Sequence, residues 1–500
     1  MTRERDQLSK AEFERLLPSV RDQLLAAQSD LQKRKPFALA VIVTGIPTAG
    51  RSEVVNHFLE WLDPKHIKVH ALEKLRHSSR TRPPLWRYWI TLPARGEIAI
   101  YFLGWYEDYL RLAEREPKKA RRHEARVFAR IRQLEAMLVK DKVRVLKLHL
   151  QVTEKTAARR LKQLRSSKLT RWRITHEDRW TLKHFDRVQQ ATQRSLHATA
   201  DKACPWHIID GTDPQLRTLM AGTILLDDLR EGLDGAGARP QHRWPETRSR
   251  KRPRFKSHQP GPDLDEQTYK VELEQLQGRF ALLVRRDDFA KRAAVFAFEG
   301  MDAAGKGGAI RRLTGALDAR QYNVMPVSAP TPEELSHPYL WRFWRNVPDR
   351  GELAIFDRSW YGRVLVERVR DLTPEPDWRR AYDEIREFEL QLAEHRIVVH
   401  KFWLVVGKDE QLKRFKERDS DALKRYKVDA EDWANRRFYD AYQAAAQEMI
   451  ERTHTDHAPW TVVEADDKRY ARLKVLKTVC EALEQALGKK ETDLFSLSRK

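Results

Sequence analysis

The hydrophobic residues in the second half of the chain form short unbroken runs that alternate with longer periodic stretches. Apolar runs of strand length occupy 293–299, 352–357, 398–406 and 460–464. Elsewhere the hydrophobic positions recur with the 3.6-residue period of a helix, over 305–317, 376–395, 408–419, 430–452 and 468–487. Because strands that alternate with helices form parallel sheets covered on both faces, we predict a three-layer α/β/α fold.

The same pattern is written twice along the chain. LWRYW at 85–89 recurs as LWRFW at 340–344, and RGEIAIYFLGWY at 95–106 recurs as RGELAIFDRSWY at 350–361. Both pairs are displaced by 255 residues, and later pairs by 254, so a single-residue indel separates the two blocks. A repeat of this length indicates a domain duplicated in tandem rather than a solenoid unit.

A stretch rich in Pro, Gly and basic residues separates the two copies. We expect a first copy over 1–235, a linker over 236–265 and a second copy over 266–500. The segment RSRKRPRFK at 248–256 suits either a solvated linker, which we favour, or an arm that binds nucleic acid or another polyanion.

Charge narrows the choice of partners. Lys and Arg number 95 against 73 for Asp and Glu, which gives a net charge of +22 and favours polyanions such as nucleic acid, anionic lipid or polyphosphate. No apolar run approaches the roughly 20 residues of a membrane span. The charged start and the two cysteines, Cys204 and Cys480, favour a reduced cytoplasmic protein, so we expect no membrane partner.

The sharpest motif is a glycine-rich turn between a predicted strand and a predicted helix. It contains Gly300, Asp302, Gly305, Lys306 and Gly307. Glycines let backbone N–H groups turn toward a phosphate, and the helix N-terminus and the lysine add positive charge. A simple tight turn is the alternative, but the strand before the motif and the repeat around it favour a phosphate-binding P-loop.

A metal in this loop needs unusual ligands, because Gly307 stands where a P-loop usually carries Ser or Thr. The candidates are Asp302 and Asp357, since Mg²⁺ takes one or two carboxylates together with phosphate oxygens and water. Asp357 also suits a helix N-cap. Arg358, beside it, is placed to clamp a transferring phosphoryl group.

Basic residues further along predict a lid over about 408–430 that closes on phosphates, although a solvated charged helix is the alternative because acidic residues are interleaved. Its candidate phosphate or nucleotide ligands are Arg414, Arg418, Lys424 and Lys427. Arg342, between aromatic residues, is a further candidate, whereas we assign Trp341, Trp344 and Trp360 to packing.

The first copy retains the turn and loses its charges. Gly45 and Gly50 remain, but the proposed functional side chains are replaced: Arg51 for Lys306, Pro47 for Asp302, Phe102 for Asp357 and Leu103 for Arg358. We expect this copy to fold and not to catalyse, and to serve either in packing or in holding a polyanion.

These motifs resemble the polyphosphate kinase 2 family across nearly all of the chain, as two copies. The resemblance in the second copy is carried by FEGMDAAGKGG at 298–308, SAPTPEELSHPYLWRFW at 328–344, FDRSWYGRVLVERV at 356–369, FE at 388–389 and the basic segment 413–427. It implies a P-loop kinase-like fold with a helical lid, and phosphoryl transfer between inorganic polyphosphate and a nucleotide with Mg²⁺. In this family, fused two-copy members make ADP from AMP, with the activity in the second copy.

Carried over by position, the resemblance implies that Asp302, Lys306, Asp357 and Arg358 are catalytic. It implies lid contacts at Arg418, Lys424 and Lys427, although the lid in the family tends to read Trp-Lys where this chain has Tyr426-Lys427. A phosphate acceptor is already ionised at neutral pH, so the lack of a His or Ser nucleophile motif fits this chemistry.

Two alternatives remain open. One is phosphorylation of ADP to ATP, or use of ATP as the donor. The other is a non-catalytic protein that binds nucleic acid or another polyanion, with a vestigial loop. The retention of Asp302, Lys306 and Asp357 argues against nucleic acid, because a vestigial site should have drifted as the first copy has. The expected partners are therefore inorganic polyphosphate and AMP or ADP, and a homo-oligomer is left open.

Overall fold

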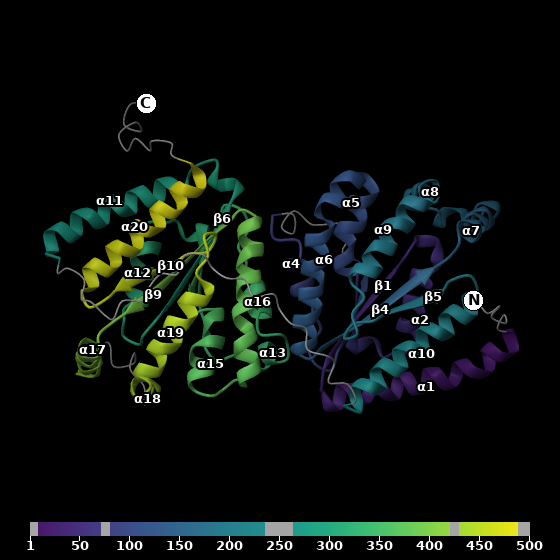
Figure 1. The fold of residues 1–500 in the computed structure, drawn as a ribbon, viewed down its shortest axis with the longest axis horizontal. Coiled ribbons are helices and arrows are strands. Elements are labelled where there is room, and N and C mark those ends of the chain that lie inside the picture. Colours follow the sequence, from purple (N-terminus) through teal and green to yellow (C-terminus); the bar gives the residue numbers. More distant parts are fainter. Residues whose placement is uncertain (1–8, 72–80, 236–263, 421–429, 489–500) are drawn as a thin grey trace. The chain divides into compact units, whose positions relative to one another are not determined.

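The computed structural model describes residues 9–71, 81–235, 264–420 and 430–488 (Figure 1). The chain forms two compact units. Unit 1 comprises Met1–Leu75, Arg87–Trp244 and Pro330–Trp341, and unit 2 comprises Arg76–Trp86, Pro245–Ala329 and Arg342–Lys500. Most of the predicted linker, including 248–256, lies outside the described residues, as do Lys424 and Lys427 of the predicted lid.

Unit 2 is built on a five-stranded sheet whose neighbouring strands are all parallel. Across the sheet the strands follow the order β7 (Tyr322–Pro326), β8 (Leu353–Asp357), β6 (Ala293–Gly300), β9 (Ile397–Val405) and β10 (Trp460–Glu464). The central strand β6 is buried along almost its whole length, as its continuous run of apolar residues predicts.

Helices cover both faces of this sheet (Figure 1). One face carries α11 (Glu266–Val284), α12 (Lys306–Thr314) and α20 (Lys468–Leu487), and the other carries α15 (Val366–Val369), α16 (Glu375–Glu394) and α19 (Tyr439–Thr453). Helix α17 (Lys408–Ser420) lies in the segment predicted as the lid, and α18 (Ala430–Arg436) begins where that segment ends. Two further short helices are α13 (Pro332–Leu335), within the Pro330–Trp341 segment of unit 1, and α14 (Trp341–Trp344).

Unit 1 repeats the same sheet. Its strands follow the order β2 (Ile67–His70), β3 (Ile98–Phe102), β1 (Ala38–Gly45), β4 (Val143–Gln151) and β5 (Trp206–Asp210), again all parallel. Its helices are α1 (Lys10–Arg34), α2 (Arg51–Trp61), α5 (Glu107–Arg115), α6 (Pro117–Lys140), α7 (Glu154–Ser166), α8 (His176–Lys183), α9 (Phe185–Ala198) and α10 (Pro214–Leu233), with the short helix α4 at Trp86–Trp89. The predicted tandem α/β/α fold is confirmed.

Two details of the prediction needed correction. Strand β7 was not predicted, because it lies at the edge of the sheet and its residues are mostly exposed, so it lacks an apolar run. The helix predicted over 430–452 is broken into α18 and α19, because Phe438 N–H closes a turn on Asn435 O at 2.9 Å.

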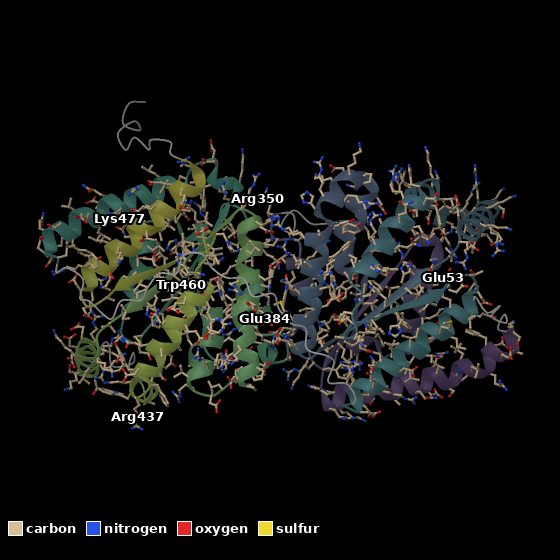
Figure 2. All side chains as sticks on the ribbon, viewed as in Figure 1. Glu53, Arg350, Glu384, Arg437, Trp460 and Lys477 are labelled. Atoms are coloured by element: carbon tan, nitrogen blue, oxygen red, sulfur yellow. The ribbon has the colours of Figure 1, made fainter. Side chains whose placement is uncertain are left out.

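Polar side chains lie around the outside of both units, whereas the aromatic residues that flank the sheets lie inside (Figure 2). Trp460, labelled within unit 2, is 4% exposed. Trp344 and Trp360 are also buried, so their assignment to packing is confirmed. Within the described ranges no helix combines the length and the apolar character needed to cross a membrane.

Candidate functional site

The glycine-rich loop of unit 2 joins the end of β6 to the start of α12. Gly300 and Gly305 adopt positive φ values of 150° and 100°. A Cβ on Gly300 would lie 2.3 Å from Leu404 O, so the neighbouring strand β9 excludes any side chain there. Gly305 is the left-handed N-cap of α12, a conformation that glycine adopts at little cost. The two glycines therefore determine the path of the loop.

Lys306 is the first residue of α12 and folds back over the loop. Its Nζ donates to Gly300 O at 2.8 Å and to Met301 O at 3.2 Å. The first N–H groups of α12 have no partners within the helix and carry the positive end of its dipole. The ammonium group and this helix end together form a positively charged surface suited to phosphate.

Asp302 lies in the loop and is held on both sides. Its Oδ1 accepts from Arg358 Nη2 at 3.1 Å, and its Oδ2 accepts from Asn435 Nδ2 at 3.0 Å. Gln411 Nε2 donates to the backbone oxygen of Asp302 at 3.0 Å. Asn435 and Gln411 were not predicted from the sequence, because they follow no motif and reach the loop only through the fold of α17 and α18.

Asp357 ends β8 directly beside the loop. The position that a Cβ would take on Gly307 is 4.0 Å from Asp357 Oδ2, which places this carboxylate against the start of α12. The following 3-10 helix is capped by Ser359, whose Oγ accepts from Tyr361 N at 3.3 Å. The alternative role of Asp357 as a helix N-cap is therefore wrong.

Arg358 turns from β8 into the site with a positive φ of 64°. Its N–H donates to Phe298 O at 2.9 Å, and its side chain reaches Asp302. Burial acts to lower the pKa of Arg358, but the carboxylates of Asp302, Glu299 and Asp357 outweigh it and raise that pKa. The guanidinium is thus a permanent cation surrounded by acidic groups.

Glu299 is a third carboxylate of the site that was not predicted. It is 5% exposed and accepts from Ser359 Oγ at 2.8 Å. Burial raises its pKa, whereas the Ser359 hydrogen bond and the charges of Lys306 and Arg358 oppose that rise. The first copy has Thr44 at the equivalent position, so comparison of the two copies was the signal that would have revealed it.

An open groove runs along the loop and the start of α12. It is lined by eight cationic side chains and three carboxylates: Lys306, Arg311, Arg312, Arg358, Arg414, Arg418, Lys468 and Arg472, with Asp302, Asp357 and Glu417. The cationic excess makes the groove suited to a polyanion. Partial burial lowers the pKa of Lys468, and the nearby charge of Arg414 is the next largest cause.

Arg414 lies beneath the loop and is committed to protein groups. It is 1% exposed, and its three nitrogens donate to Glu410 and to backbone oxygens of the loop and of the segment after β10: Glu410 Oε1 at 2.8 Å, Ala303 O at 2.9 Å, Ala465 O at 2.7 Å and Asp466 O at 2.7 Å. This placement corrects its predicted role, because a guanidinium held by four protein acceptors positions the loop instead of binding a ligand.

Arg160 repeats the backbone contacts of Arg414 in unit 1, whereas Thr156 stands at the position of Glu410. Its Nη1 donates to Thr48 O at 2.6 Å, and its Nη2 donates to Gly211 O and to Thr212 O at 3.1 Å. These are the counterparts of the Arg414 contacts in the repeat. We call this arginine and its backbone acceptors the clamp. Because unit 1 keeps the clamp although it has lost the functional charges, the clamp stabilises the fold and is not part of the chemistry.

The other predicted binding residues are placed at the edges of the groove. Arg418 lines it from α17. Arg342 does not line the groove. Its Nη1 donates at 3.2 Å to the backbone oxygen of Ser328, and Ser328 is a lining residue. The structure thus brings Asp302, Lys306, Asp357, Arg358 and Arg418 together, with Gly300, Gly305 and Gly307 in the loop.

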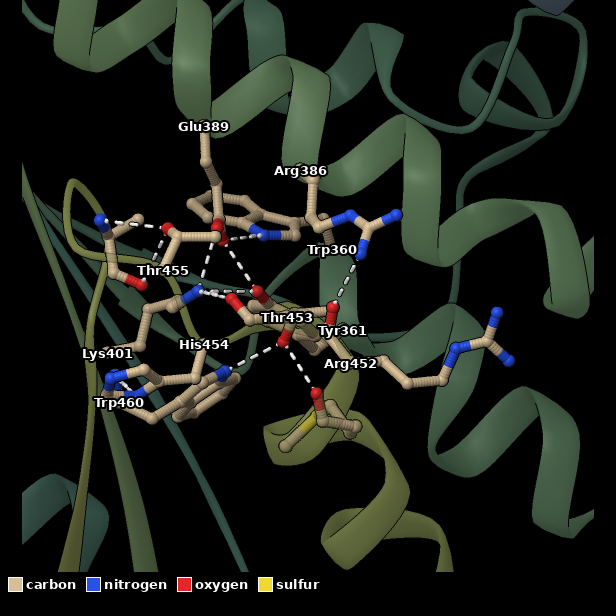
Figure 3. A network of polar contacts seen from close by, with 12 residues as sticks. Trp360, Tyr361, Arg386, Glu389, Lys401, Arg452, Thr453, His454, Thr455 and Trp460 are labelled. Carbon is tan, nitrogen blue, oxygen red and sulfur yellow. Dashed lines mark hydrogen bonds and ion pairs between the residues drawn. The ribbon is translucent and has the colours of Figure 1, made fainter. Parts of the chain in front are cut away.

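A buried polar network supports the turn that carries Arg358 (Figure 3). Lys401 Nζ donates to Glu389 Oε2 at 2.7 Å, to Tyr361 OH at 2.9 Å and to Thr453 O at 2.8 Å. Tyr361 OH and Trp360 Nε1 both donate to the other oxygen of Glu389, at 2.7 and 3.0 Å. Unit 1 repeats this network, with Lys147 bonded to Glu135 Oε2 at 2.8 Å. Its presence in both units shows that it belongs to the fold.

A second cavity meets the groove at Asp302 and Arg358, which line both. Most of its other walls are aliphatic, aromatic and amide side chains, with the charged Glu299 and Arg436 beside them; the uncharged members include Leu365, Val366, Trp403, Gln411, Asn435, Tyr439 and Tyr442. Mixed apolar and polar walls of this kind are typical of a pocket for a small organic ligand.

The equivalent site of unit 1 keeps a cavity, which Thr44, Pro47, Arg51 and Leu103 help to line. Arg51, at the Lys306 position, is buried and lies 3.6 Å from Glu177 Oε1. Leu103 retains the positive φ of Arg358, at 59°, and Gly45 retains the close approach to β4. The backbone path is preserved while the functional charges are absent.

The carboxylates of the site suit a magnesium ion that is also bound by a substrate. Asp302 and Asp357 both line the groove beside the loop. Among the residues that the structure describes, no three His, Cys, Asp or Glu side chains gather closely enough to hold a metal. Two carboxylates are sufficient for Mg²⁺ where phosphate oxygens and water complete its shell.

Comparison with known proteins gives consistent matches along both units. The family model for polyphosphate kinase 2 matches residues 7–233 and 263–491. The chain is 41% identical to the polyphosphate:AMP phosphotransferase of Pseudomonas aeruginosa over 486 residues, which cover 96% of this chain and 98% of that protein. It is 37% identical to the protein of that name from Acinetobacter johnsonii, over 91% of this chain and 92% of that one.

A solved structure matches to the same extent. A crystal structure of a polyphosphate kinase 2 from Pseudomonas aeruginosa superposes with a TM-score of 0.84 at 38% identity, over 97% of this chain and 98% of that one. By contrast, the ADP-polyphosphate phosphotransferase of Pseudomonas aeruginosa matches 43% of this chain, at 39% identity. The loop geometry, the two tandem sheets and these matches agree, and the chain belongs to the polyphosphate kinase 2 family.

Proposed function

We propose that this protein transfers the terminal phosphoryl group of inorganic polyphosphate to AMP, giving ADP, in the groove of unit 2. The observation that carries the proposal is the convergence of Lys306, Arg358, Asp302 and Asp357 on one glycine-rich loop in a cation-lined groove. The relatives that match nearly the whole chain support AMP as the acceptor, since they carry that name.

The arrangement suits a reaction that needs alignment and charge neutralisation more than proton transfer. The acceptor phosphate is ionised at neutral pH, so no general base has to be supplied. Lys306 and the first amides of α12 would bind the transferred phosphate, and Arg358 would stabilise the charge that develops on it. The other cations of the groove, apart from Arg414, would hold the rest of the polyphosphate chain.

We place AMP in the second cavity, beside Asp302 and Arg358. Its aliphatic and aromatic walls suit a nucleoside, while Arg358 lies where the cavity and the groove meet. This placement brings the acceptor phosphate to the loop from one side and the donor from the other.

Asp302 and Asp357 would hold Mg²⁺, which when bound neutralises charge on the phosphate oxygens. Neither carboxylate has an equivalent in unit 1, where Pro47 and Phe102 stand instead. We therefore assign the activity to unit 2. We place the reaction in the cytosol, since both cysteines are free and buried, as in proteins of reducing compartments.

The test offers donors and acceptors in turn to the purified protein with Mg²⁺. Long-chain polyphosphate with AMP should give ADP, and replacing polyphosphate by ATP should remove the product. Chelation of Mg²⁺ should also stop the reaction. If the protein forms ATP from ADP more efficiently than ADP from AMP, the acceptor is ADP and not AMP. If ADP is formed from AMP with ATP and without polyphosphate, the proposal of polyphosphate as the donor is refuted.

A further inference from the structure

Helix α7 of unit 1 is the counterpart of α17, the first helix of the lid segment in unit 2. The two helices align with the 254-residue displacement of the repeat. The four acidic residues of α17 are all lost in α7, where Asp409, Glu410, Glu417 and Asp419 are replaced by Lys155, Thr156, Gln163 and Arg165, and one acidic residue is gained, since Glu154 replaces Lys408. Unit 1 has therefore become more basic here, although its loop has lost its functional charges.

The cations of this segment are exposed and are not matched by carboxylates. We call the segment the basic strip, and its members are Lys155, Arg159, Lys162, Arg165, Lys168, Arg171 and Arg173. Among the described residues, none of these seven has a carboxylate oxygen within 4.0 Å. In α17, by contrast, Glu410 pairs with both Lys413 and Arg414.

The basic strip is arranged as a row. Lys155, Arg159 and Lys162 follow one another at intervals of four and three residues, so they share one face of α7. The helical rise separates neighbours by about 4.5–6 Å along the axis. Arg171 and Arg173 continue beyond the end of the helix, in a short 3-10 turn. A row of unmatched cations suits a long linear polyanion.

These cations have no evident purpose at the degenerate loop of unit 1. Arg51 already occupies that loop and lies beside Glu177. Arg160, on the same helix, is directed to the backbone beneath the loop. The exposed members of the basic strip are thus separate in function from both.

We propose that the basic strip is a non-catalytic binding site for inorganic polyphosphate, which retains a long donor chain on the enzyme between transfers. This inference rests on the proposed function for its choice of polyanion.

Nucleic acid is the less favoured ligand. Binding of single-stranded nucleic acid relies on several aromatic platforms, and Trp172 is the one aromatic residue between Lys155 and Arg173. The Nε1 of Trp172 donates to Leu169 O at 2.7 Å, and Arg173 lies over its ring at 5.4 Å.

The test removes four charges from the strip in the full chain, as Arg159→Gln, Lys162→Gln, Arg165→Gln and Lys168→Gln together. The KM for long-chain polyphosphate should rise about tenfold at 0.1 M salt, with a weaker salt dependence. The kcat and the KM for a short donor such as tripolyphosphate should not change. That unchanged reaction also shows that the variant is folded.

A matched control removes four exposed cations from α6 of the same unit, as Lys118→Gln, Lys119→Gln, Arg121→Gln and Arg122→Gln. An equal rise in KM in this control would overturn the proposal, because it would show a general charge effect. An unchanged KM for long donors in the strip variant would also overturn it.

Direct binding separates the two proposals. Labelled long-chain polyphosphate should bind the native protein more tightly than the strip variant, whether or not ADP is formed. If the native protein binds polyphosphate more tightly than the strip variant but forms no ADP, the proposed function is refuted and the basic strip is still supported as a polyphosphate site. A loss of affinity for single-stranded DNA, with none for polyphosphate, would overturn the basic strip as a polyphosphate site.

Discussion

At the scale of single residues, comparison of the two copies distinguishes residues that stabilise the fold from residues that are candidates for catalysis. Arg160 repeats the backbone contacts of Arg414, and Lys147 repeats the carboxylate contact of Lys401, so the roles of Arg414 and Lys401 are structural. Lys306 does not, because Arg51 stands in its place beside Glu177. Residues that keep their geometry in both copies hold the fold, and those found only in unit 2 are candidates for catalysis.

The clamp on the loop gives a matched pair of variants. Arg414→Lys should lower the free energy of unfolding of unit 2 by about 2–4 kcal/mol, since lysine cannot replace a buried fork of donors. It should also raise the KM for polyphosphate, because the loop loses its support. Arg160→Lys should destabilise unit 1 less, because Arg160 is half-buried and has no carboxylate partner among the described residues, and it should leave kcat unchanged, measured by chemical unfolding and by ADP formation.

A loss of turnover in Arg160→Lys equal to that in Arg414→Lys, with folding preserved, would contradict the separation of the two roles. Equal stability of all three proteins would show that the clamp contributes nothing.

The sequence predicted the catalytic candidates better than their supports. Asp302, Lys306, Asp357 and Arg358 lie in motifs at the ends of predicted strands, and parallel strands bring such ends to one edge. Asn435 could not be predicted, because its distance from the loop is set by the packing of α18. Arg414 was misassigned, because a basic residue in a charged helix gives no sign in the sequence that it turns inward.

At the scale of elements, the strands next to the central ones, β9 and β4, each carry a buried histidine. His400 on β9 is 7% exposed and lies 2.8 Å from Thr461 Oγ1. Burial lowers the pKa of His400 to about 3, with Lys401 the next cause. Burial also lowers the pKa of His149, on the equivalent strand β4 of unit 1, to about 4. Both strands therefore hold neutral imidazoles at pH 7.

These histidines predict a loss of stability in acid. A folded-state pKa below the unfolded value near 6.5 means that the unfolded chain binds the extra proton, so stability is present above pH 6.5 and falls as the pH drops toward the folded pKa. For His400 the loss by pH 4 is about 3 kcal/mol. His400→Gln should flatten the dependence of unfolding free energy on pH between 6.5 and 4.

The control for this prediction is the exposed His123, changed to Gln. It should leave the pH dependence of denaturant unfolding as it is in the native protein. An unaltered pH dependence in His400→Gln would show that this imidazole is not held neutral.

The strands of the sheets were predictable because each central strand is a continuous apolar run. The edge strand β7 was missed for the opposite reason, since a half-exposed strand needs no such run. The break between α18 and α19 was also missed, because the residues around Phe438 continue a helical pattern and contain no glycine or proline.

At the scale of the whole molecule, one fold is used twice with different outcomes. Unit 1 preserves the sheet order, the positive φ of Leu103 and the buried network, and it lacks the carboxylates of the site. Restoring one of them as Phe102→Asp, in a Lys306→Ala background, should give no ADP. Thr44, Pro47 and Arg51 would still stand at the other functional positions.

Formation of ADP by that double variant, above the level of Lys306→Ala alone, would show that unit 1 is closer to an active site than its residues indicate. The measurement is ADP formation from AMP and polyphosphate by the two purified variants.

The most direct test of the central claim compares two equivalent positions in one assay. ADP formation from AMP and long-chain polyphosphate, with Mg²⁺ and without ATP, is measured for the native protein, Lys306→Ala and Arg51→Gln. We predict that Lys306→Ala lowers kcat by about 10²–10³ or more, while the folded Arg51→Gln protein keeps a rate near the native one. A near-native rate in Lys306→Ala, or a loss confined to Arg51→Gln, would contradict a catalytic site in unit 2.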